Sequence, residues 1–391
     1  MNISRRRFLQ GTSVGLLVSS FVTPNSRVHA AEAPAHEIQE IKSISRHPGI
    51  YYGWPTVGIN YQTNELYVVA SGGREAHRCP FGRVDFFRSK DLGETWTWPR
   101  TIFDGPSDDR DAGLLVTRKG TILVTFYADD QYRDLLAKEL ECRLRGETPR
   151  FDDDKLARWQ AVEARMTDED RKKELGCWMI RSTDHGLNWS VKYPTLLNNP
   201  HGPIECSDGR LLYPGRNFFQ NAPVMGVVES TDDGATWNYL SSIPPRRGDD
   251  AGNCHELHGV EAADGTIIVQ IRNHNLNNLY ETLQTESADG GKTWSEIHST
   301  GVWGFPSHLL RLVDDRLLMT YGYRRDTLGN RARISNDHGK TWSEPITISD
   351  HADNIDFGYP STVQLPNGSL LTVWYENMGM TCVRVAKWKL N

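Results

Sequence analysis

Six short segments of the chain combine small or aromatic residues with side chains that can transfer protons or bind anions. Each segment precedes a turn and a hydrophobic run, and the segments follow one another at intervals of roughly 50 residues except around the second. Carboxylates, imidazoles and phenols are the groups that general acid–base catalysis uses. Turn formation could explain one or two of these polar residues, but their return at equivalent places predicts one shared functional pocket. The residues concerned are Trp54, Asp109, Arg110, Asp111, His201, Glu256, His258, Phe305 and Tyr359.

A second repeat identifies the elements that must position these residues. Its pattern is Ser-x-Asp-x-Gly-x-Thr-Trp, in which the Asp carboxylate can accept backbone N–H groups and the Gly can adopt a positive φ. The pattern therefore predicts a tight β-turn, followed by a Trp that buries a large apolar face. Five copies in one chain indicate a repeat architecture. The copies occupy residues 89–96, 182–189 (with Asn188 in place of Thr), 230–237, 287–294 and 335–342.

Hydrophobic runs complete each repeating unit. One run follows each opening segment, and in the first five units the repeated turn follows the run. Six units of about four strands each predict an all-β fold, a six-bladed β-propeller. The last unit lacks the repeated turn, so the N-terminal strand is expected to complete its blade. The runs are 66–70, 122–126, 211–213, 267–271, 317–321 and 370–374.

The second unit is longer than the others because of an insert over residues 131–174. Helical spacing is seen in both halves of the insert. The residues are Leu135 or Leu136, Leu140 and Leu144 in the first half, and Leu156, Trp159, Val162 and Met166 in the second. The acidic run 152–154 could open the second helix. We predict two amphipathic helices between strands of blade two. Such an insert could be a lid, an oligomer contact or a surface hairpin.

The N-terminus has the pattern of an export signal. Residues 4–9 read Ser-Arg-Arg-Arg-Phe-Leu, a short apolar run follows, and Val28-His29-Ala30 offers a small-residue cleavage site. We therefore expect a twin-arginine signal peptide at 1–30, a linker at 31–39 and the propeller at 40–391. The chain would then be periplasmic or secreted, with no membrane attachment after cleavage, because the apolar run is short for a membrane span.

Charge and cysteine spacing exclude several function classes. The net charge of −6 becomes about −10 without residues 1–30, which argues against a nucleic-acid surface. The six cysteines show no Cys-x-x-Cys pair, and His255-Glu256-Leu257-His258 is not the zinc-helix motif. We expect mostly free, buried thiols, no metal and no cofactor.

The repeated turn resembles the Asp box, or bacterial neuraminidase repeat, of the sialidase superfamily. The last unit, from Gly358-Tyr359-Pro360 through Asn367-Gly368 to Trp374-Tyr375-Glu376, resembles the segment that carries that family's nucleophilic tyrosine. The resemblance covers essentially the whole mature chain and is also seen with uncharacterised secreted bacterial sialidase-like proteins. It implies a sialidase-like propeller and an exported, retaining exo-glycosidase. Its partner would be a glycan or oligosaccharide that ends in a terminal, acidic sugar.

The resemblance also implies roles for individual residues. Tyr359 corresponds to the nucleophile and Glu256 to its base, while Arg272 and Arg324 correspond to two of three arginines that grip the substrate carboxylate. Sialidases are the tyrosine exception among glycosidases. The choice has a chemical reason, because a carboxylate nucleophile would be repelled by an acidic sugar. A phenol with a pKa near 10 needs a neighbouring base, which Glu256 would supply.

Two positions differ from the family pattern. Trp54 stands where sialidases have their first arginine, so Arg74 or Arg110 would complete the anion clamp. The segment 74–83, where the family's acid/base Asp belongs, contains no Asp. Glu75, His77 or Asp111 would then act as the acid/base, and Trp54, His201 and His258 would contribute to substrate binding.

Other interpretations of these residues remain open. Tyr359 could be a core aromatic, the arginines could form ion pairs between blades, and the histidines could hydrogen-bond to strand starts. Histidine and tyrosine at the mouth also fit a polysaccharide lyase that acts on a uronate. A third possibility is a glycan-binding propeller without catalysis.

Overall fold

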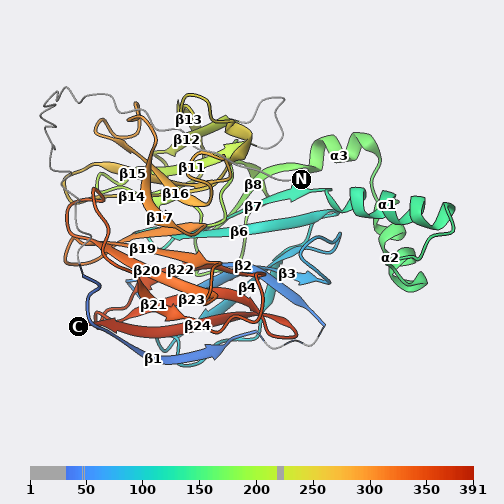
Figure 1. Ribbon diagram of the computed structural model, residues 1–391, viewed down its shortest axis with the longest axis horizontal. Helices are drawn as coiled ribbons and strands as arrows, with labels where there is room; N and C mark the ends of the chain where they lie inside the picture. The colour runs from blue at the N-terminus through green and yellow to red at the C-terminus, as the bar shows by residue number, and fades with distance from the viewer. Residues whose placement is uncertain (1–31, 46, 48, 218–223) are drawn as a thin grey trace, which may run out of the picture.

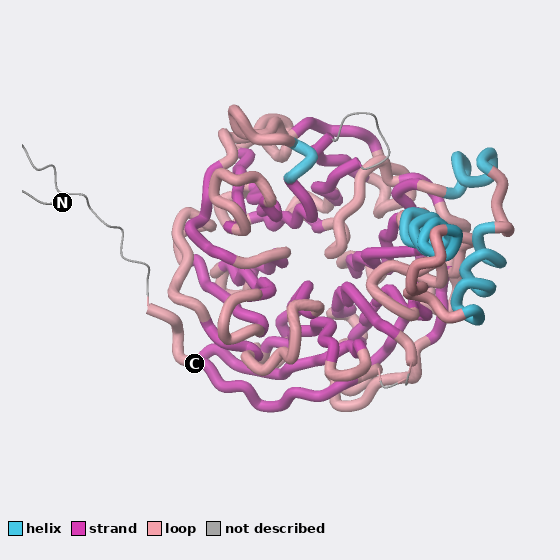
Figure 2. Tube along the Cα trace, turned by 45° about the vertical axis from the view of Figure 1, so that its right-hand side comes forward, coloured by secondary structure: helices cyan, strands magenta, loops and turns pink. Residues whose placement is uncertain are grey.

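The computed structural model describes residues 32–45, 47, 49–217 and 224–391, and in it the sheets form a ring (Figures 1 and 2). Six four-stranded antiparallel sheets follow one another along the chain. Five have their strands in chain order, and the sixth combines the last three strands with the first. The twin-arginine segment lies outside the described residues. The predicted six-bladed β-propeller is therefore confirmed.

Each blade has four strands, named from the axis outward as the innermost, second, third and outer strand. The innermost strands are β2 (Tyr51–Asn60), β6 (Asp108–Val116), β10 (Ile204–Glu205), β14 (Cys254–Glu261), β18 (Ser307–Arg311) and β22 (Phe357–Gln364). The second strands are β3 (Glu65–Arg74), β7 (Ile122–Asp129), β11 (Leu211–Asn217), β15 (Ile267–Asn273), β19 (Leu317–Tyr323) and β23 (Leu370–Asn377). The third are β4 (Arg83–Ser89), β8 (Gly176–Ser182), β12 (Val224–Ser230), β16 (Glu281–Ser287), β20 (Gly329–Ser335) and β24 (Thr381–Leu390). The outer strands are β5 (Arg100–Phe103), β9 (Tyr193–Pro194), β13 (Asn238–Ser242), β17 (His298–Trp303), β21 (Ile346–Ser349) and β1 (His36–Ser43).

The N-terminal strand closes the ring, as expected. β1 pairs antiparallel with β24, so blade six consists of β22, β23, β24 and β1. The strand begins at His36, so the ordered blade starts four residues before the predicted boundary at 40. Joining the two chain ends in one sheet leaves no blade with an unpaired third strand.

The five repeated turns connect the third and fourth strands of blades one to five. In the turn after β12, Ser230 ends the strand, and the Asp232 carboxylate accepts Thr236 N–H at 2.9 Å and Thr236 Oγ1 at 2.6 Å. Residues 233 and 234 have φ values of +61° and +82°, which explains the glycine at the second position. The turns lie at the outer edge of the blades, away from the axis.

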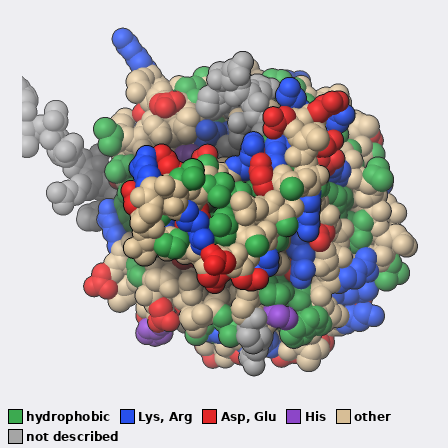
Figure 3. Space-filling view, turned by 90° about the vertical axis from the view of Figure 1, so that its right-hand side faces the viewer, with side chains coloured by type: hydrophobic (Ala, Val, Ile, Leu, Met, Phe, Trp, Pro, Cys, Tyr) green, Lys and Arg blue, Asp and Glu red, His purple; other side chains and the backbone are tan. Residues whose placement is uncertain are grey.

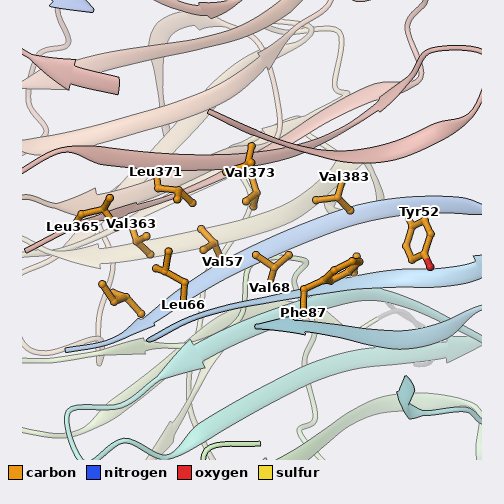
Figure 4. Close-up of a cluster of buried hydrophobic side chains, with 13 residues drawn as sticks. Tyr52, Val57, Leu66, Val68, Phe87, Val363, Leu365, Leu371, Val373 and Val383 are labelled. Carbon is orange, nitrogen blue, oxygen red and sulfur yellow. The ribbon is translucent and has the colours of Figure 1, made fainter. Parts of the chain in front are cut away.

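Apolar side chains pack between neighbouring blades. Figure 4 shows one such cluster, in which side chains of β2, β3 and β4 meet those of β22, β23 and β24. Val68, Leu371 and Val383 in this cluster are fully buried. Alternating residues of each strand face one neighbouring blade or the other, so both faces of each sheet are covered.

The insert contains three helices rather than the predicted two. These are α1 (Tyr132–Leu144), α2 (Asp153–Glu163) and α3 (Asp168–Glu174), and a short 3-10 turn, η1 (Ala251–Asn253), precedes β14. Asp152 caps α2 by accepting Lys155 N–H at 2.7 Å, as the acidic run suggested. Thr167 and Asp170 form a capping box that starts α3, so the second predicted helix ends before Met166. None of the described helices has the length and apolar character needed to cross a bilayer.

Candidate active site

Three side chains from two blades meet at the mouth of the ring. Tyr359 on β22 donates its hydroxyl to Glu256 Oε1 on β14 at 2.6 Å. Arg272 Nη1 on β15 donates to both Glu256 oxygens at 2.9 and 3.0 Å, and to Tyr359 Oη at 3.0 Å. All three residues were predicted from the sequence as site residues, and the structure brings them into direct contact.

The surroundings set the protonation of this triad. Burial raises the pKa of Tyr359 well above its usual value, and the neighbouring Glu256 carboxylate adds to the shift. Burial would also raise the pKa of Glu256, but Arg272, His255 and the Tyr359 hydroxyl outweigh it and hold that pKa below the usual value. The resting pair is therefore a neutral phenol hydrogen-bonded to a carboxylate. That is the starting state for a nucleophile activated by a general base.

Local bulges in the innermost strands aim the site residues at the axis. The pairing register of β2, β6, β14 and β22 with their neighbours shifts at Trp54, Asp111, Glu256 and Tyr359 respectively. Trp54, Asp111 and Tyr359 have positive φ values of 51°, 49° and 55°. A bulge re-aims a side chain against the pleat, and such backbone strain in non-glycine residues is typical of functional sites.

Asp111 interacts electrostatically with the triad and is itself buried. Its residue is 7% exposed, and its Oδ1 has no hydrogen-bond partner among the described residues. Burial raises the pKa of Asp111 to about 7, against the lowering effects of Arg110 and Arg74 and with a further rise from Glu256. Asp111 therefore exchanges a proton in the neutral pH range.

Arg74 and Arg110 are packed on Trp54 and paired with carboxylates. Their guanidinium carbons lie 4.9 and 4.7 Å from the Trp54 ring centroid. Arg74 is fully buried in a two-bond pair with Asp108, whereas Arg110 approaches Asp108 and Asp129 only to 3.9 and 4.0 Å. Of the two, Arg110 has the greater capacity to bind an added anion.

Arg324 and Arg272 both lie against the Phe305 ring, but they differ in how many of their N–H donors remain free for a ligand. Arg324 donates to the carbonyls of Phe305, Ile355 and Phe357 at 2.7–3.2 Å, so its guanidinium holds loops together. Arg272 Nε donates to His274 Nε2 at 3.0 Å, and nothing in the described part of the chain accepts a bond from its Nη2. Of these two arginines, Arg272 therefore keeps the free donor nitrogen, and the three-arginine clamp stays a prediction.

His201 and His258 lie deeper along the axis, together with His308. His201 is 1% exposed, its ring is 6.3 Å from that of Tyr359, and neither of its nitrogens has a partner in the described structure. The His258 and His308 rings stack at 4.4 Å. Burial lowers the pKa of all three, so they are neutral. They face an axial cavity of about 710 Å³ that continues along the inner strands.

Glu75 and His77 follow β3 and lie at the rim. Glu75 pairs with Arg158 and accepts Trp159 Nε1–H of α2 at 3.2 Å, so it anchors the insert. His77 contacts Trp54 edge-on at 5.0 Å, and its side chain is 50% exposed. Asp108, at the start of β6, pairs with Asp129, at the end of β7, and α1 begins three residues later. The starts of the innermost strands, where the candidate site lies, are therefore on the face of the ring that carries the insert. Figure 3 shows that face, on which acidic and basic side chains both lie.

Several site residues were not found from the sequence. His274 could have been, because it lies two residues after Arg272 and so faces the same side. Tyr375 pairs with Gly358 across β23 and β22, and Asp356 precedes β22. Asp129 and His308 complete the set. Strand register and loop path bring these residues to the site, and neither has a local sequence signal. The described residues contain no group of three or more metal-binding side chains placed to hold an ion.

Comparison with known proteins agrees with this architecture. The model of the BNR repeat-like domain family matches residues 152–372. A sialidase of Bacteroides fragilis (strain YCH46) is 26% identical over 229 residues, which cover 51% of this chain and 39% of that protein.

Two solved structures have the same fold. A protein of unknown function from Dyadobacter fermentans DSM 18053 superposes with a TM-score of 0.73 at 24% identity, covering 92% of this chain and 100% of that one. The Hadza microbial sialidase Hz136 gives a TM-score of 0.62 at 18% identity, covering 86% of this chain and 65% of the other. With its six blades, its repeated turns and a family match over more than half its length, the chain belongs to the BNR repeat-like family and to the sialidase-like superfamily.

Proposed function

We propose that the protein is a retaining exo-glycosidase of sialidase type that hydrolyses a terminal, acidic sugar from glycans. The observation that carries this proposal is the 2.6 Å hydrogen bond from Tyr359 to Glu256, with Arg272 in contact with both. The similar sialidase of Bacteroides fragilis supports the substrate class.

In the proposed mechanism, each member of the triad has a step. Tyr359 Oη attacks the anomeric carbon as the bond from that carbon to the leaving-group oxygen breaks. The leaving oxygen takes a proton from the acid/base residue, the phenol proton passes to Glu256, and a covalent glycosyl–tyrosine forms. Arg272 stabilises the developing negative charge on the phenol oxygen, and its Nη2 offers a hydrogen bond to an anionic substrate group. A water molecule, which gives a proton to the acid/base residue, then displaces Tyr359 from the anomeric carbon and releases the sugar, and the proton returns from Glu256 to Tyr359.

Replacing Tyr359 by Phe tests the nucleophile. The variant keeps the ring and its packing but loses the attacking oxygen, so turnover should fall by about 10³-fold or more with an unchanged circular-dichroism spectrum. Tyr239→Phe, on the outer strand β13, is the matched control and should retain full activity. Full activity of Tyr359→Phe would exclude this role.

A substrate screen tests the reaction type. Fluorogenic sialosides, uronides and neutral glycosides are incubated with the protein, and the anomeric configuration of the first product is followed by NMR. A retained configuration supports the proposal. An unsaturated uronate would identify a lyase instead, and glycan binding without turnover would identify a binding protein.

We also propose export by the twin-arginine pathway. The support is the Ser-Arg-Arg-Arg-Phe-Leu pattern at residues 4–9, the short apolar run that follows it and the small-residue site Val28-His29-Ala30. Cell fractionation of the full-length chain tests this placement, and a protein that stays in the cytoplasm would contradict it.

A further inference from the structure

One carboxylate oxygen at the rim of the site has three partners. Asp356 Oδ1, in the loop before β22, accepts the hydroxyl protons of Tyr51 at 2.9 Å and Tyr375 at 3.1 Å. His77 Nδ1 lies 3.2 Å from the same oxygen. Because both phenols donate to Asp356, the carboxylate is ionised and His77 directs its Nδ1–H toward it. His77 Nε2 is then the ring nitrogen left to exchange a proton with a ligand.

This pair borders a second cavity, separate from the axial one. The cavity has a volume of about 450 Å³ and lies between the ends of blades one and six, on the face of the candidate site. Its size is within the range of roughly 300–1,000 Å³ found for small-molecule sites. It adjoins the candidate site through Trp54, whose ring centroid lies 5.0 Å from that of His77 and 6.4 Å from that of Tyr359. The lining includes Tyr51, Glu75, His77, Asp356 and Met380.

We propose that His77, oriented by Asp356, is the acid/base catalyst of the proposed glycosidase and that this cavity binds the leaving-group sugar. The inference rests on the proposed function. An acid must reach the oxygen of the departing group, which leaves toward solvent. The half-exposed His77 side chain lines the cavity, whereas Asp111 Oδ1 is enclosed and Glu75 is bound to α2.

The proposed reaction has two steps, after which each group has regained its proton. In the first, the bond from the anomeric carbon to the leaving oxygen breaks as Tyr359 attacks. The leaving oxygen takes the Nε2 proton of the His77 imidazolium, and Glu256 takes the phenol proton. In the second, neutral His77 removes a proton from water, whose oxygen displaces Tyr359 from the anomeric carbon. Glu256 then reprotonates the tyrosine, and the site returns to its starting state.

The charges around His77 predict the pH range of activity. Burial and the guanidinium groups of Arg110 and Arg74 lower the pKa of His77, while the Asp356 carboxylate raises it, and the net pKa lies below the usual value. Glu75 also borders the cavity. The imidazolium needed for the first step is therefore favoured in mildly acidic solution.

Leaving-group dependence tests the role of His77. The 4-nitrophenyl and methyl glycosides of the sugar that the wild-type protein hydrolyses are compared with the His77→Gln variant. Loss of a general acid should lower kcat/KM about 10³-fold for the methyl glycoside, but less than tenfold for the 4-nitrophenyl glycoside, whose leaving group needs no proton. Azide, which replaces the activated water, should speed release of the sugar from the variant.

The alternative outcomes are distinct. An equal loss of kcat/KM on both substrates overturns the role of His77. A leaving-group-dependent loss in Asp111→Asn with none in His77→Gln assigns the acid to Asp111. If Tyr359→Phe inactivates the protein in either case, the proposed function stands while this inference fails. Absence of any glycoside turnover by the wild-type protein overturns both.

Asp356 is a positioning residue, and its test is the pH profile. Asp356→Asn removes the negative charge that favours the imidazolium, so the limb of the kcat profile set by His77 should move about one unit toward lower pH. Asp353→Asn, exposed in the same loop, is the matched control and should leave the profile in place. A profile that does not move in Asp356→Asn overturns the positioning role, whatever its effect on stability.

Discussion

At the scale of single residues, opposite pKa shifts separate the roles of the buried acids. Glu256 is held ionised by Arg272, whereas Asp111 lacks a comparable partner and its pKa rises to about 7. Two carboxylates on facing strands are therefore in different protonation states near neutral pH. Such a divergence is typical of catalytic sites, where one group must accept a proton that another can donate.

The pKa of Asp111 predicts a pH-dependent stability. The folded state binds this proton more tightly than the unfolded chain, so the contribution to stability is present below about pH 4 and is lost as the pH rises toward 7. Asp111→Asn should therefore raise the free energy of unfolding at pH 8 by as much as about 4 kcal/mol and change it little at pH 4. Urea unfolding at both pH values measures the difference.

Asp91, in the repeated turn of blade one, provides a control of opposite sign. Burial acts to raise its pKa, but hydrogen bonds from Thr95 and Ser89 lower it to about 2. Its contribution to stability is present above the unfolded pKa and is lost as the pH falls through 2. Asp91→Asn should therefore destabilise the protein at pH 8. A gain in stability at pH 8 from both variants, or from neither, would contradict these assignments.

At the scale of elements, the repeated turns also act as spacers between blades. The glycine of each turn packs against an apolar side chain of the preceding blade, and a Cβ at Gly234 would lie 2.5 Å from Leu123 Cδ1. The glycine is thus required both by its positive φ and by this close approach. The turn motif therefore fixes blade spacing, which in turn determines where the innermost strands converge.

Two glycine substitutions separate these two requirements. Gly234 and Gly368 both have a φ of +82°, but nothing lies within 4 Å of a Cβ at Gly368. Gly368→Ala should cost about 1 kcal/mol from backbone strain alone, and Gly234→Ala about 3 kcal/mol because crowding of Leu123 adds to it. Chemical denaturation measures both. Equal costs would mean that the turn has no spacing role.

At the scale of the whole molecule, ring closure depends on an N-terminal strand far from its partner in sequence. β1 covers β24, and Ile38 packs on the apolar cluster that contains Trp374 and Trp388. Without β1, the third strand of blade six would be a long exposed edge. Closure keeps blades one and six together, and the candidate site draws Trp54 and Tyr359 from these two blades.

Truncation tests this closure. A chain that begins at His36 keeps the whole of β1 and should unfold like the chain that begins at residue 32. A chain that begins at Ile44 loses the strand and should melt more than about 10 °C lower, or aggregate through the exposed edge of β24. Thermal unfolding followed by circular dichroism measures the difference, and equal melting temperatures would show that β1 is dispensable.

The sequence alone determined the frame of this protein. Repeats are local patterns, and the glycine, aspartate and tryptophan of each turn encode a backbone conformation that needs no distant partner, so blade number, strand order and ring closure could be predicted. The pattern also named Tyr359 and Glu256, because equivalent places in a repeat lie at equivalent places in the fold, and the family resemblance added Arg272. The third helix was missed because its seven residues, all charged, give no apolar spacing.

Only the tertiary structure decided how the site is assembled. The bulges at Trp54, Asp111 and Tyr359 turn these side chains out of the strand alternation that sequence reasoning assumes. Hydrogen-bond partners also change the roles expected from the sequence. Arg324 binds three backbone carbonyls, and Asp356, which belongs to no sequence motif, contacts His77. Hydrogen-bond partners and desolvation depend on contacts between distant segments, so they arise when the ring closes and cannot be inferred from local sequence.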